Sequence, residues 1–224
     1  MKHRIHSKFM IMAIINIQTL LEHGASYRHI VSGEEVFHEG TPAAFYYQIV
    51  DGFVRWSNFT EDGKEVLQLL AGPGESIGEL PLFDNIPYAA SAIAETNGVL
   101  LKLPIEAFRR LLNSCPDIHF QFTKLFCERL RFKFFLLKEI VTFSPTERIQ
   151  RILEYLKSIH QNICPDCLKV KLTRQQLANL TGLRVETVIR GIKCLEKKGI
   201  LRIEKGKVFL NESSSERRQA FCFS

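Results

Sequence analysis

The chain has 224 residues, enough for one large domain or two ordinary ones, and its hydrophobic fraction of 46% is typical of a globular protein. Six cysteines in a chain of this length do not indicate a small disulfide scaffold, because a core of this size needs no covalent staples. The net charge of +6 is unevenly spread: residues 145–224 hold 16 Lys and Arg against 8 Asp and Glu, whereas residues 1–144 hold 14 against 16. Basic charge gathered in the last third favours a partner that carries phosphates, although a solvated basic face would have the same composition.

The N-terminal segment is basic in MKHRIHSK and then apolar in FMIMAII, an order that resembles a secretory signal. The apolar run is only seven residues long and no small-residue cleavage site follows it, so we expect no cleaved signal. The chain continues through polar residues to Leu20 and Leu21, a pattern that suits an amphipathic helix, and residues 1–28 are predicted to be helical. No stretch reaches the roughly 20 apolar residues of a spanning helix. We therefore expect a cytoplasmic protein with no membrane partner.

Short runs of β-forming residues, separated by turn signals such as Asp51-Gly52, follow from residue 29 onward. Their spacing of roughly 8–12 residues is typical of an antiparallel sandwich or barrel-like roll. The strands are predicted over residues 29–32, 35–38, 45–50, 53–59, 65–70, 90–94 and 98–103. The first half of the chain is therefore predicted to be an antiparallel β-roll.

After a short helix over residues 105–113, a long helix is predicted to begin at Pro116, because the first helical turn tolerates proline. Its apolar residues follow a 3-4 spacing that Arg129 interrupts, and further apolar residues widen this surface. A helix that is apolar over two faces must be buried on both. We expect one face on the β-roll and the other on a second copy of the chain; burial within a monomer is the alternative. The residues assigned to the dimer surface are Phe122, Leu125, Phe126, Phe132 and Leu136.

Ser144-Pro145 marks a hinge, after which apolar positions between residues 149 and 156 predict a helix and residues 168–172 a strand. Thr173 and Gln176 then form a capping box, in which each side chain accepts from a backbone donor at a helix start. Gly182 stands where a tight turn needs a residue free to adopt a positive φ.

A second helix is predicted from about residue 184 to residue 198, where Gly199 stops it. Residues 200–203 and 208–210 then form a hairpin around Lys205-Gly206. Helix, turn, helix and hairpin make a winged helix-turn-helix, which predicts DNA binding. The fold class is α+β, in three parts: an N-terminal helix and β-roll (1–114), a long connecting dimerisation helix (115–143) and a C-terminal winged helix-turn-helix domain (144–224).

These three parts, in this order, resemble the family of the cyclic-AMP receptor protein and the fumarate-nitrate reduction regulator, the CRP/FNR family. One motif that carries the resemblance is GPGESIGELPLF at residues 72–83, similar to the family's phosphate-binding cassette. The other is LTRQQLA at residues 172–178, followed by GLRVETVIR at residues 182–190. The resemblance covers nearly the whole chain. It implies a cyclic-nucleotide-binding-like sensor domain and a homodimeric transcription regulator that binds two-fold symmetric DNA and contacts RNA polymerase.

Glu186 and Arg190 lie one helical turn apart and so project from one face. In a major groove, Arg can donate twice to guanine and Glu can accept from cytosine, and the resemblance assigns base reading to both residues. A simple ion pair between them is the alternative. Val185 stands where cyclic-AMP receptor proteins have Arg. The sequence Val-Glu-Thr looks more like the branch of the fumarate-nitrate reduction regulator, and this resemblance implies a TGA-like half-site core. Ile189 replaces that branch's serine and could touch a thymine methyl group or merely pack.

The residues assigned to base reading are Glu186, Thr187, Ile189 and Arg190. Those better placed for DNA phosphates are Thr173, Arg174, Gln175, Arg184, Lys205 and Lys207. Phosphate contacts of this kind position a protein on DNA without reading its sequence.

Cyclic-nucleotide binding in this family needs a Gly-Glu pair and an Arg about ten residues later. Gly78 and Glu79 are present, but residues 87–92 read PYAASA and contain no Arg or Lys. A buried phosphate without a cation is costly, so we expect no response to cyclic AMP and leave the effector unknown. Glu79 can then be a structural residue, and Tyr88 and Ser91 could hydrogen-bond a different ligand. The candidate effector pocket comprises Gly78, Glu79, Leu80, Tyr88, Ala89, Ala90 and Ser91.

The pair Cys164 and Cys167 forms a Cys-x-x-Cys motif, which is half of a zinc site. Two ordinary thiols, a zinc site and a redox pair all stay open. An iron–sulfur sensor would need about four thiolates, and no cysteine precedes Cys115. We find no nucleophile–base or catalytic-metal pattern and expect no enzyme. The rival hypothesis is a small-molecule- or redox-sensing signalling module whose basic C-terminal domain binds a protein partner.

Overall fold

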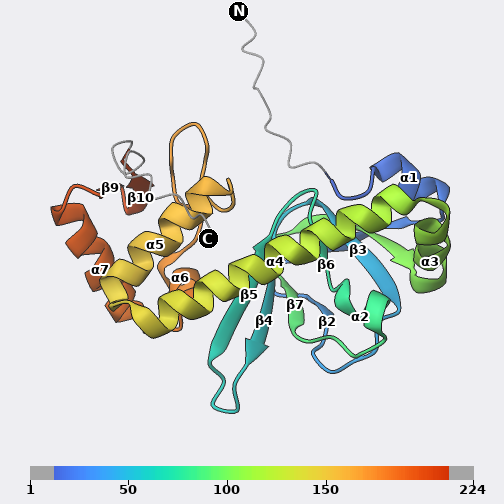
Figure 1. Cartoon of the computed structure of the whole chain (residues 1–224), viewed down its shortest axis with the longest axis horizontal. Coiled ribbons are helices and arrows are strands. Elements are labelled where there is room, and N and C mark those ends of the chain that lie inside the picture. Colours follow the sequence, from blue (N-terminus) through green and yellow to red (C-terminus); the bar gives the residue numbers. More distant parts are fainter. Residues whose placement is uncertain (1–12, 212–224) are drawn as a thin grey trace, which may run out of the picture. The chain divides into compact units, whose positions relative to one another are not determined.

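The computed structural model of the chain describes residues 13–211 and divides into two compact units, residues 1–129 and 130–224. The boundary between the units lies within a long helix, α4 (Pro116–Thr142). Figure 1 shows the helices and strands of both units. The basic start of the chain, most of its first apolar run, and the C-terminal tail with Cys222 lie outside the described residues.

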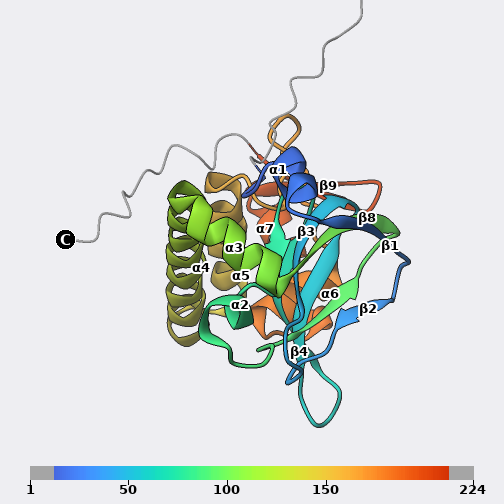
Figure 2. The same ribbon diagram turned by 90° about the vertical axis from the view of Figure 1, so that its right-hand side faces the viewer.

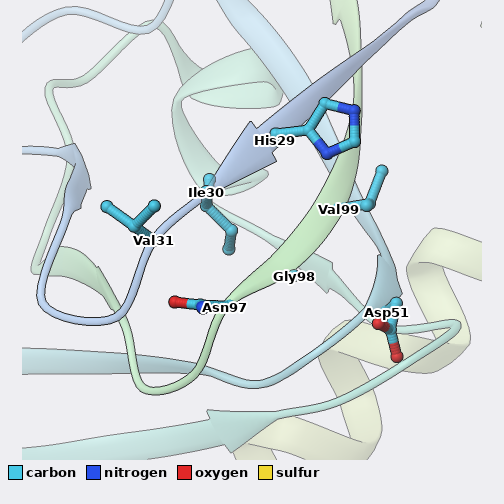
Figure 3. Close-up of a pocket in the computed structure, with 7 residues that line it drawn as sticks. All are labelled: His29, Ile30, Val31, Asp51, Asn97, Gly98 and Val99. Carbon is cyan, nitrogen blue, oxygen red and sulfur yellow. The ribbon is translucent and has the colours of Figure 1, made fainter.

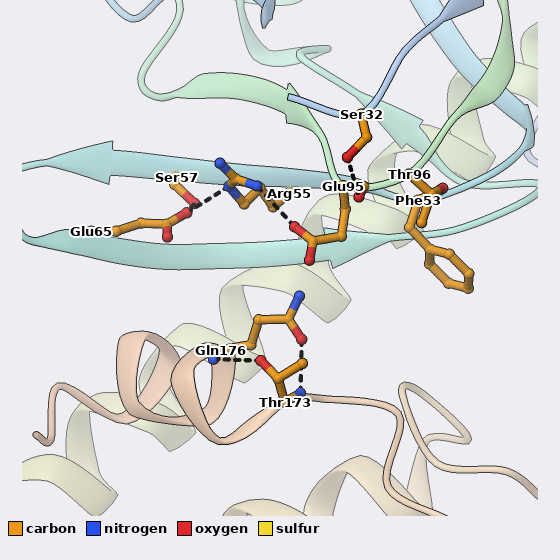
Figure 4. Close-up of polar contacts among 9 residues, drawn as sticks. All are labelled: Ser32, Phe53, Arg55, Ser57, Glu65, Glu95, Thr96, Thr173 and Gln176. Carbon is orange, nitrogen blue, oxygen red and sulfur yellow. Dashed lines mark hydrogen bonds and ion pairs between the residues drawn. The ribbon is translucent and has the colours of Figure 1, made fainter. Parts of the chain in front are cut away.

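Unit 1 contains the expected antiparallel β-roll, built from two four-stranded sheets with strand orders β1-β8-β3-β6 and β2-β7-β4-β5. Buried apolar side chains from both sheets form one core, which includes Tyr47, Trp56 and Leu100. Arg55 of β4 reaches Glu65 at 3.0 Å and Glu95 at 2.9 Å, tying β4 to its neighbours (Figure 4). The strands are β1 (Ser26–Ile30), β2 (Glu35–Phe37), β3 (Phe45–Asp51), β4 (Val54–Phe59), β5 (Glu65–Ala71), β6 (Ser76–Ile77), β7 (Ser91–Ala94) and β8 (Gly98–Pro104).

Residues 13–28 are the described part of the span that is predicted to be helical. Helix α1 covers only Ile17–Glu22, and the Asn16 side chain caps it by accepting from the backbone N–H of Gln18. Gly24 takes a φ of +92° just after the helix, a conformation that favours glycine. Residues 26–30 then pair with β8 instead of continuing the helix, because strand pairing buries Ile30. The prediction of helix up to residue 28 is therefore wrong.

Helices α2 (Leu80–Asp84), α3 (Ile105–Ser114) and the first half of α4 gather on one side of the strands (Figure 2). Aromatic rings join them to the sheet. The ring of Tyr46 in β3 stacks on Phe108 of α3 at 4.8 Å, and Phe108 meets Phe122 of α4 edge-on at 5.5 Å. All three side chains are fully buried. This cluster fixes the N-terminal half of α4 on unit 1.

Unit 2 holds the rest of α4 and the expected helix-turn-helix with its wing. Its helices are α5 (Pro145–Ser158), α6 (Arg174–Thr181) and α7 (Val185–Lys197), and its strands are β9 (Leu201–Glu204) and β10 (Lys207–Leu210). Helices α5 and α7 approach closely at Gly191, where an added Cβ would lie 2.7 Å from the side chain of Ile149. The resulting core contains Ile152, Val188 and Leu195.

The strand predicted over residues 168–172 is not formed as such. Leu168 has a φ of +57°, and only isolated bridges occur, between Ile163 and Val170 and between Lys169 and Phe209. A left-handed residue breaks the regular alternation that a ladder needs. The segment is therefore a short hairpin-like loop whose returning arm hydrogen-bonds to β10.

The interior face of α4 is the one that the sequence analysis assigned to the dimer. Phe122 is fully buried in unit 1, and Leu125 and Phe126 pack against the same cluster. In unit 2, Phe132 stacks on Tyr155 at 5.4 Å and Leu136 is buried. Phe122 and Leu136 are buried within the chain and cannot lie on an outward dimer surface, so the assignment is corrected for these two residues. Leu125, Phe126 and Phe132 are half-buried, and their place in a dimer stays a prediction. The 3-4 spacing was real, but spacing alone does not say which face a partner covers.

Candidate nucleic-acid interface and effector site

The start of α6 is fixed by the predicted capping box (Figure 4). The backbone N–H of Gln176 donates to Thr173 Oγ1 at 3.1 Å, and the backbone N–H of Thr173 donates to Gln176 Oε1 at 2.8 Å. At the other end, Gly182 caps α6 with a φ of +69°. Both features are as the sequence predicts, and they set the turn that leads into α7.

Helix α7 has a buried inner face and an exposed outer face. Val188, Ile192 and Leu195 are buried. Glu186, Ile189 and Arg190 are exposed, whereas Thr187 is half-buried. Ile189 is 40% exposed, so it does not belong to the core. No ion pair joins Glu186 to Arg190 within the described part of the chain, so both side chains are available to an external partner.

Lys193 is a further exposed cation on α7 that the sequence analysis missed. It stands three residues after Arg190 and therefore lies on the same side of the helix. A basic residue at that spacing within the second helix was the signal that could have found it. The outer face thus carries one carboxylate, one apolar side chain and two cations.

The wing turns through Lys205 and Gly206, whose φ values are +47° and +76°. Two consecutive positive φ values in a two-residue loop are typical of a type I′ hairpin, and Glu204 pairs with Lys207 across it. Lys205 and Lys207 are exposed.

The other residues assigned to phosphates lie around α6 and the start of α7. Thr173, Gln175 and Arg184 are exposed, and Arg174 is half-buried. Because Thr173 is the N-cap residue of α6, the first backbone N–H groups of this helix lie beside these side chains.

Arg148 of α5 connects the end of α4 to the end of α6 and was not singled out from the sequence. Its guanidinium donates to the backbone oxygen of Ile140 at 2.7 Å and to that of Thr181 at 3.2 Å. Helix C-termini leave carbonyl groups without intrahelical partners, and a cation near them is favourable. The helix-turn-helix is thereby attached to the C-terminal turn of α4 within unit 2.

The candidate effector residues surround a densely packed part of the roll. Gly78 has a φ of +68°, and a Cβ there would lie 2.5 Å from the ring of Phe37 and 2.8 Å from that of Tyr88. The two rings stack at 3.8 Å, and both side chains are buried. Only glycine fits at this position. Leu80, by contrast, is 38% exposed at the start of α2.

Glu79 is completely buried and forms an ion pair with Arg129 of α4. Arg129 also donates to the backbone oxygen of Ser76 at 2.9 Å, and its guanidinium lies 5.8 Å from the ring centre of Trp56. Burial lowers the pKa of Arg129 to about 10. The residue that interrupts the apolar row of α4 is thus the partner of Glu79. A single Arg within a row of apolar residues on one helix face was the signal in the sequence that could have indicated a buried ion pair.

The segment that lacks the expected Arg uses its own polar groups internally. Trp56 Nε1 donates to the backbone oxygen of Ala90 at 2.9 Å, and Asn58 Nδ2 donates to that of Ala89 at 2.6 Å. The hydroxyl of Ser91 accepts from the backbone N–H of Glu39 at 2.9 Å. Neither Tyr88 nor Ser91 presents an exposed polar surface, since both are buried.

An open depression of about 370 Å³ lies elsewhere on the roll (Figure 3). His29, Asp51 and Asn97 contribute its polar side chains. It contains none of the predicted effector residues. Among residues 13–211, no group of three or more His, Cys, Asp or Glu side chains is arranged to hold a metal ion. Within the same range, no helix has the length and apolar character needed to cross a membrane.

Two family models match this chain: a cyclic nucleotide-binding domain over residues 27–115 and a Crp-like helix-turn-helix domain over residues 147–213. The chain is 28% identical over 190 residues to the CRP-like cAMP-activated global transcriptional regulator of Mycobacterium tuberculosis, covering 84% of this chain and 85% of the relative. It is 29% identical over 189 residues to the cyclic AMP receptor protein of Thermus thermophilus, with the same coverage. The chain belongs to the CRP/FNR family.

Solved structures of this family have the same fold as this chain. The c-di-GMP responsive global regulator CLP of Xanthomonas campestris superposes with a TM-score of 0.71 at 25% identity, over 87% of this chain and 97% of that one. FixK2 of Bradyrhizobium japonicum gives a TM-score of 0.73 at 19% identity, over 85% and 94%, which is a likeness of fold alone. The relatives' names specify different effectors, so membership of the CRP/FNR family does not select one.

The Glu79–Arg129 pair should be essential to unit 1. Arg129→Met leaves a fully buried carboxylate without its cation, which we expect to lower the free energy of unfolding by about 3 kcal/mol. Trp56 is the single tryptophan of the chain and lies beside Arg129, so its fluorescence in a urea titration reports this unit. The double variant Glu79→Leu/Arg129→Met removes both charges and should recover most of the loss. A double variant as unstable as Arg129→Met would contradict the ion-pair explanation.

Proposed function

We propose that this CRP/FNR-family regulator acts as a homodimer that reads two-fold symmetric DNA with a TGA-like half-site core, and that its effector is not cyclic AMP. The observation that carries the DNA-binding part is the outer face of α7. Its exposed groups differ in chemistry, as base reading requires, and none is engaged in an ion pair within the described residues.

Base reading is assigned to Glu186, Thr187, Ile189 and Arg190. Arg190 can donate to guanine O6 and N7, and Glu186 can accept from cytosine N4. The exposure of Ile189 supports contact with a thymine methyl group in place of packing. The half-buried Thr187 is available only over part of its surface.

Phosphate contacts are assigned to the exposed cations and polar groups around this face. Arg184, Lys205 and Lys207 bring positive charge from the start of α7 and from the wing. Thr173, Arg174 and Gln175 stand at the N-terminus of α6, where backbone N–H groups also favour an anion. Such contacts fix the position of α7 on the duplex. Two further proposals are carried over from the family: the protein acts in the cytoplasm, and it contacts RNA polymerase there.

Dimerisation is supported by a stripe on α4 that we call the α4 seam. Its members are exposed and follow strict alternating spacings of three and four residues: Phe120, Thr123, Cys127, Leu130, Phe134, Leu137 and Val141. This is the a/d pattern of a two-stranded coiled coil. Phe120 is 73% exposed and Val141 77%, an unusual exposure for apolar residues in a row. A second copy of α4 in parallel orientation would cover the seam and supply the two-fold axis that a symmetric DNA site requires.

The sensor differs from a cyclic-AMP site in its charge. The cation nearest to Glu79 is Arg129, and its charge is already paired with the Glu79 carboxylate. Residues 87–92 bring no cation, and the carbonyl groups of Ala89 and Ala90 accept hydrogen bonds from β4. A cyclic phosphate placed here would be buried without a counter-charge.

Arg190→Ala should weaken binding to a TGA-containing symmetric duplex by about 1–3 kcal/mol and change binding to a random duplex little, because the guanine contact is lost and phosphate contacts remain. Lys205→Ala is the matched control, expected to weaken both duplexes alike and to reduce the salt slope by about 1. Fluorescence anisotropy at several salt concentrations measures both. Equal losses for Arg190→Ala on the two duplexes would argue against base reading.

Phe134→Glu should convert the protein from a dimer to a monomer, since it places like charges opposite each other at the centre of the α4 seam. Gln121→Glu adds the same charge at an exposed α4 position off the seam and should leave the dimer intact. Light scattering after gel filtration should give twice 25.8 kDa for the unaltered chain and the control, and 25.8 kDa for Phe134→Glu. A dimeric Phe134→Glu variant would exclude this surface.

Millimolar cyclic AMP should leave the thermal unfolding temperature unchanged. A ligand at 100 times its dissociation constant stabilises a folded protein by about 2.7 kcal/mol, so binding with micromolar affinity would be visible as a clear upward shift. Differential scanning fluorimetry with Trp56 as the probe measures this directly. A saturable upward shift would show that the roll accommodates the phosphate without an Arg near Ala89.

A further inference from the structure

The loop between α5 and α6 contains two cysteines that neither the family fold nor the DNA-reading face explains. Cys164 is half-buried and Cys167 is exposed. They stand at the tip of a short hairpin that the Ile163–Val170 bridge closes. The backbone N–H of Leu168 donates to the Cys164 oxygen at 2.9 Å, and that of Cys164 donates to the Lys169 oxygen at 2.9 Å. The tip is therefore a defined turn that holds the two thiols on one short loop.

The backbone of this loop adopts unusual conformations. His160, Asn162 and Leu168 all have φ values between +55° and +57°. A positive φ is uncommon for a leucine and is energetically costly. At Leu168 this conformation turns the chain back so that Lys169 can bond to Cys164. Strained backbone conformations cluster at functional sites, and the one at Leu168 directly follows Cys167.

The surroundings of the thiols favour the reactive form of Cys164. The backbone N–H of Cys167 is the largest cause that lowers the pKa of Cys164, followed by the Cys167 side chain and the backbone of Asp166. A hydrogen bond to sulfur stabilises the thiolate, which is the nucleophile in thiol–disulfide exchange. Metal binding has less support, because no third His, Cys, Asp or Glu among residues 13–211 joins the pair into a possible site.

The loop is connected to the wing by backbone hydrogen bonds. The backbone N–H of Val170 donates to the Val208 oxygen at 2.9 Å, and that of Leu210 donates to the Leu168 oxygen at 3.0 Å. Residues 168–170 therefore act as a third arm beside β10. A change in the Cys164–Cys167 turn reaches β10 through Leu168, the residue with the positive φ.

We propose that Cys164 and Cys167 form a reversible dithiol–disulfide site that exchanges with low-molecular-weight disulfides and alters the backbone pairing of the wing. The Cys164 thiolate attacks one sulfur of the small disulfide; the S–S bond breaks, and one small thiol leaves with a proton. The Cys167 thiol gives up its proton and attacks Cys164 Sγ, which releases the second small thiol. Two protein thiols are oxidised to one disulfide, and the small disulfide is reduced to two thiols.

Oxidation joins the sulfur atoms of Cys164 and Cys167 by a covalent bond with its own geometric demands on the two residues. The turn must adjust, and the adjustment falls on Leu168 and its bond from Leu210. We therefore expect faster amide exchange at Leu210 and Val170 in the oxidised protein. The α6 amides of Leu177 and Ala178, which lie outside this hydrogen-bonded loop, should not change.

The test equilibrates the full chain with reduced and oxidised glutathione at a series of ratios, quenches with acid, alkylates and digests with trypsin. Cleavage after Lys157 and Lys169 gives a peptide, residues 158–169, that contains these two cysteines and no others. The expected result under oxidising conditions is an unalkylated peptide two hydrogen atoms lighter than the unmodified dithiol, and reduction should return the peptide fully to its doubly alkylated form. Cys164→Ser and Cys167→Ser should each abolish this species, whereas Cys115→Ser, at a half-buried thiol in unit 1, should not.

Hydrogen exchange on the same samples supplies the second readout, and thermal unfolding of each variant confirms that it folds. Thiols that stay reduced throughout, or a lasting glutathione adduct at one cysteine without ring closure, would overturn the proposal. So would unchanged exchange at Leu210 and Val170 in a protein shown to be oxidised. The effect on DNA affinity rests in addition on the proposed function. The peptide mass and the exchange rates do not depend on the proposed function. The failure of the disulfide proposal can therefore be told from the failure of the proposed DNA-binding function.

Discussion

The inward face of helix α4 is the packing surface on which both units depend, because its buried side chains belong to the core of unit 1 in the first half of the helix and to that of unit 2 in the second. In its first half, Phe122 packs in an aromatic cluster with Tyr46 and Phe108. Its second half stacks Phe132 on Tyr155 of α5 and buries Glu139 against Arg151. These contacts use the inward face. The α4 seam is left exposed, and it forms an apolar stripe that the described residues do not cover.

The same helix explains the character of the sensor. Arg129 stands in the inward row of α4 because Glu79 of the roll requires a counter-charge in a buried place. The cation of this region thus comes from the long helix, and it is occupied by a carboxylate. The neighbouring space is filled by the stacked rings of Phe37 and Tyr88. A ligand that enters here must displace packed side chains or separate this pair, and either event would act on α4 directly.

In unit 2, the orientation of the outer face of α7 depends on a few local features of the backbone. The capping box at Thr173 and the positive φ of Gly182 orient α6 and α7. The close approach at Gly191 seats α7 on α5, and the bonds of Arg148 attach this assembly to the end of α4. The exposed groups of α7 are therefore held by a rigid base, while the wing depends on backbone pairing with the loop that carries Cys164 and Cys167.

Features that depend on neighbours along the chain could be predicted from the amino-acid sequence alone: the strand spacing, the start of α4 at Pro116, the capping box, the turn at Gly182 and the wing at Lys205-Gly206. Each follows from local propensity or from a periodic pattern. Only the tertiary structure decided which face of α4 is inward, that Arg129 is the partner of Glu79, and that residues 168–170 pair with β10. These depend on contacts between segments far apart in sequence, such as Glu79 and Arg129, for which local periodicity gives no partner.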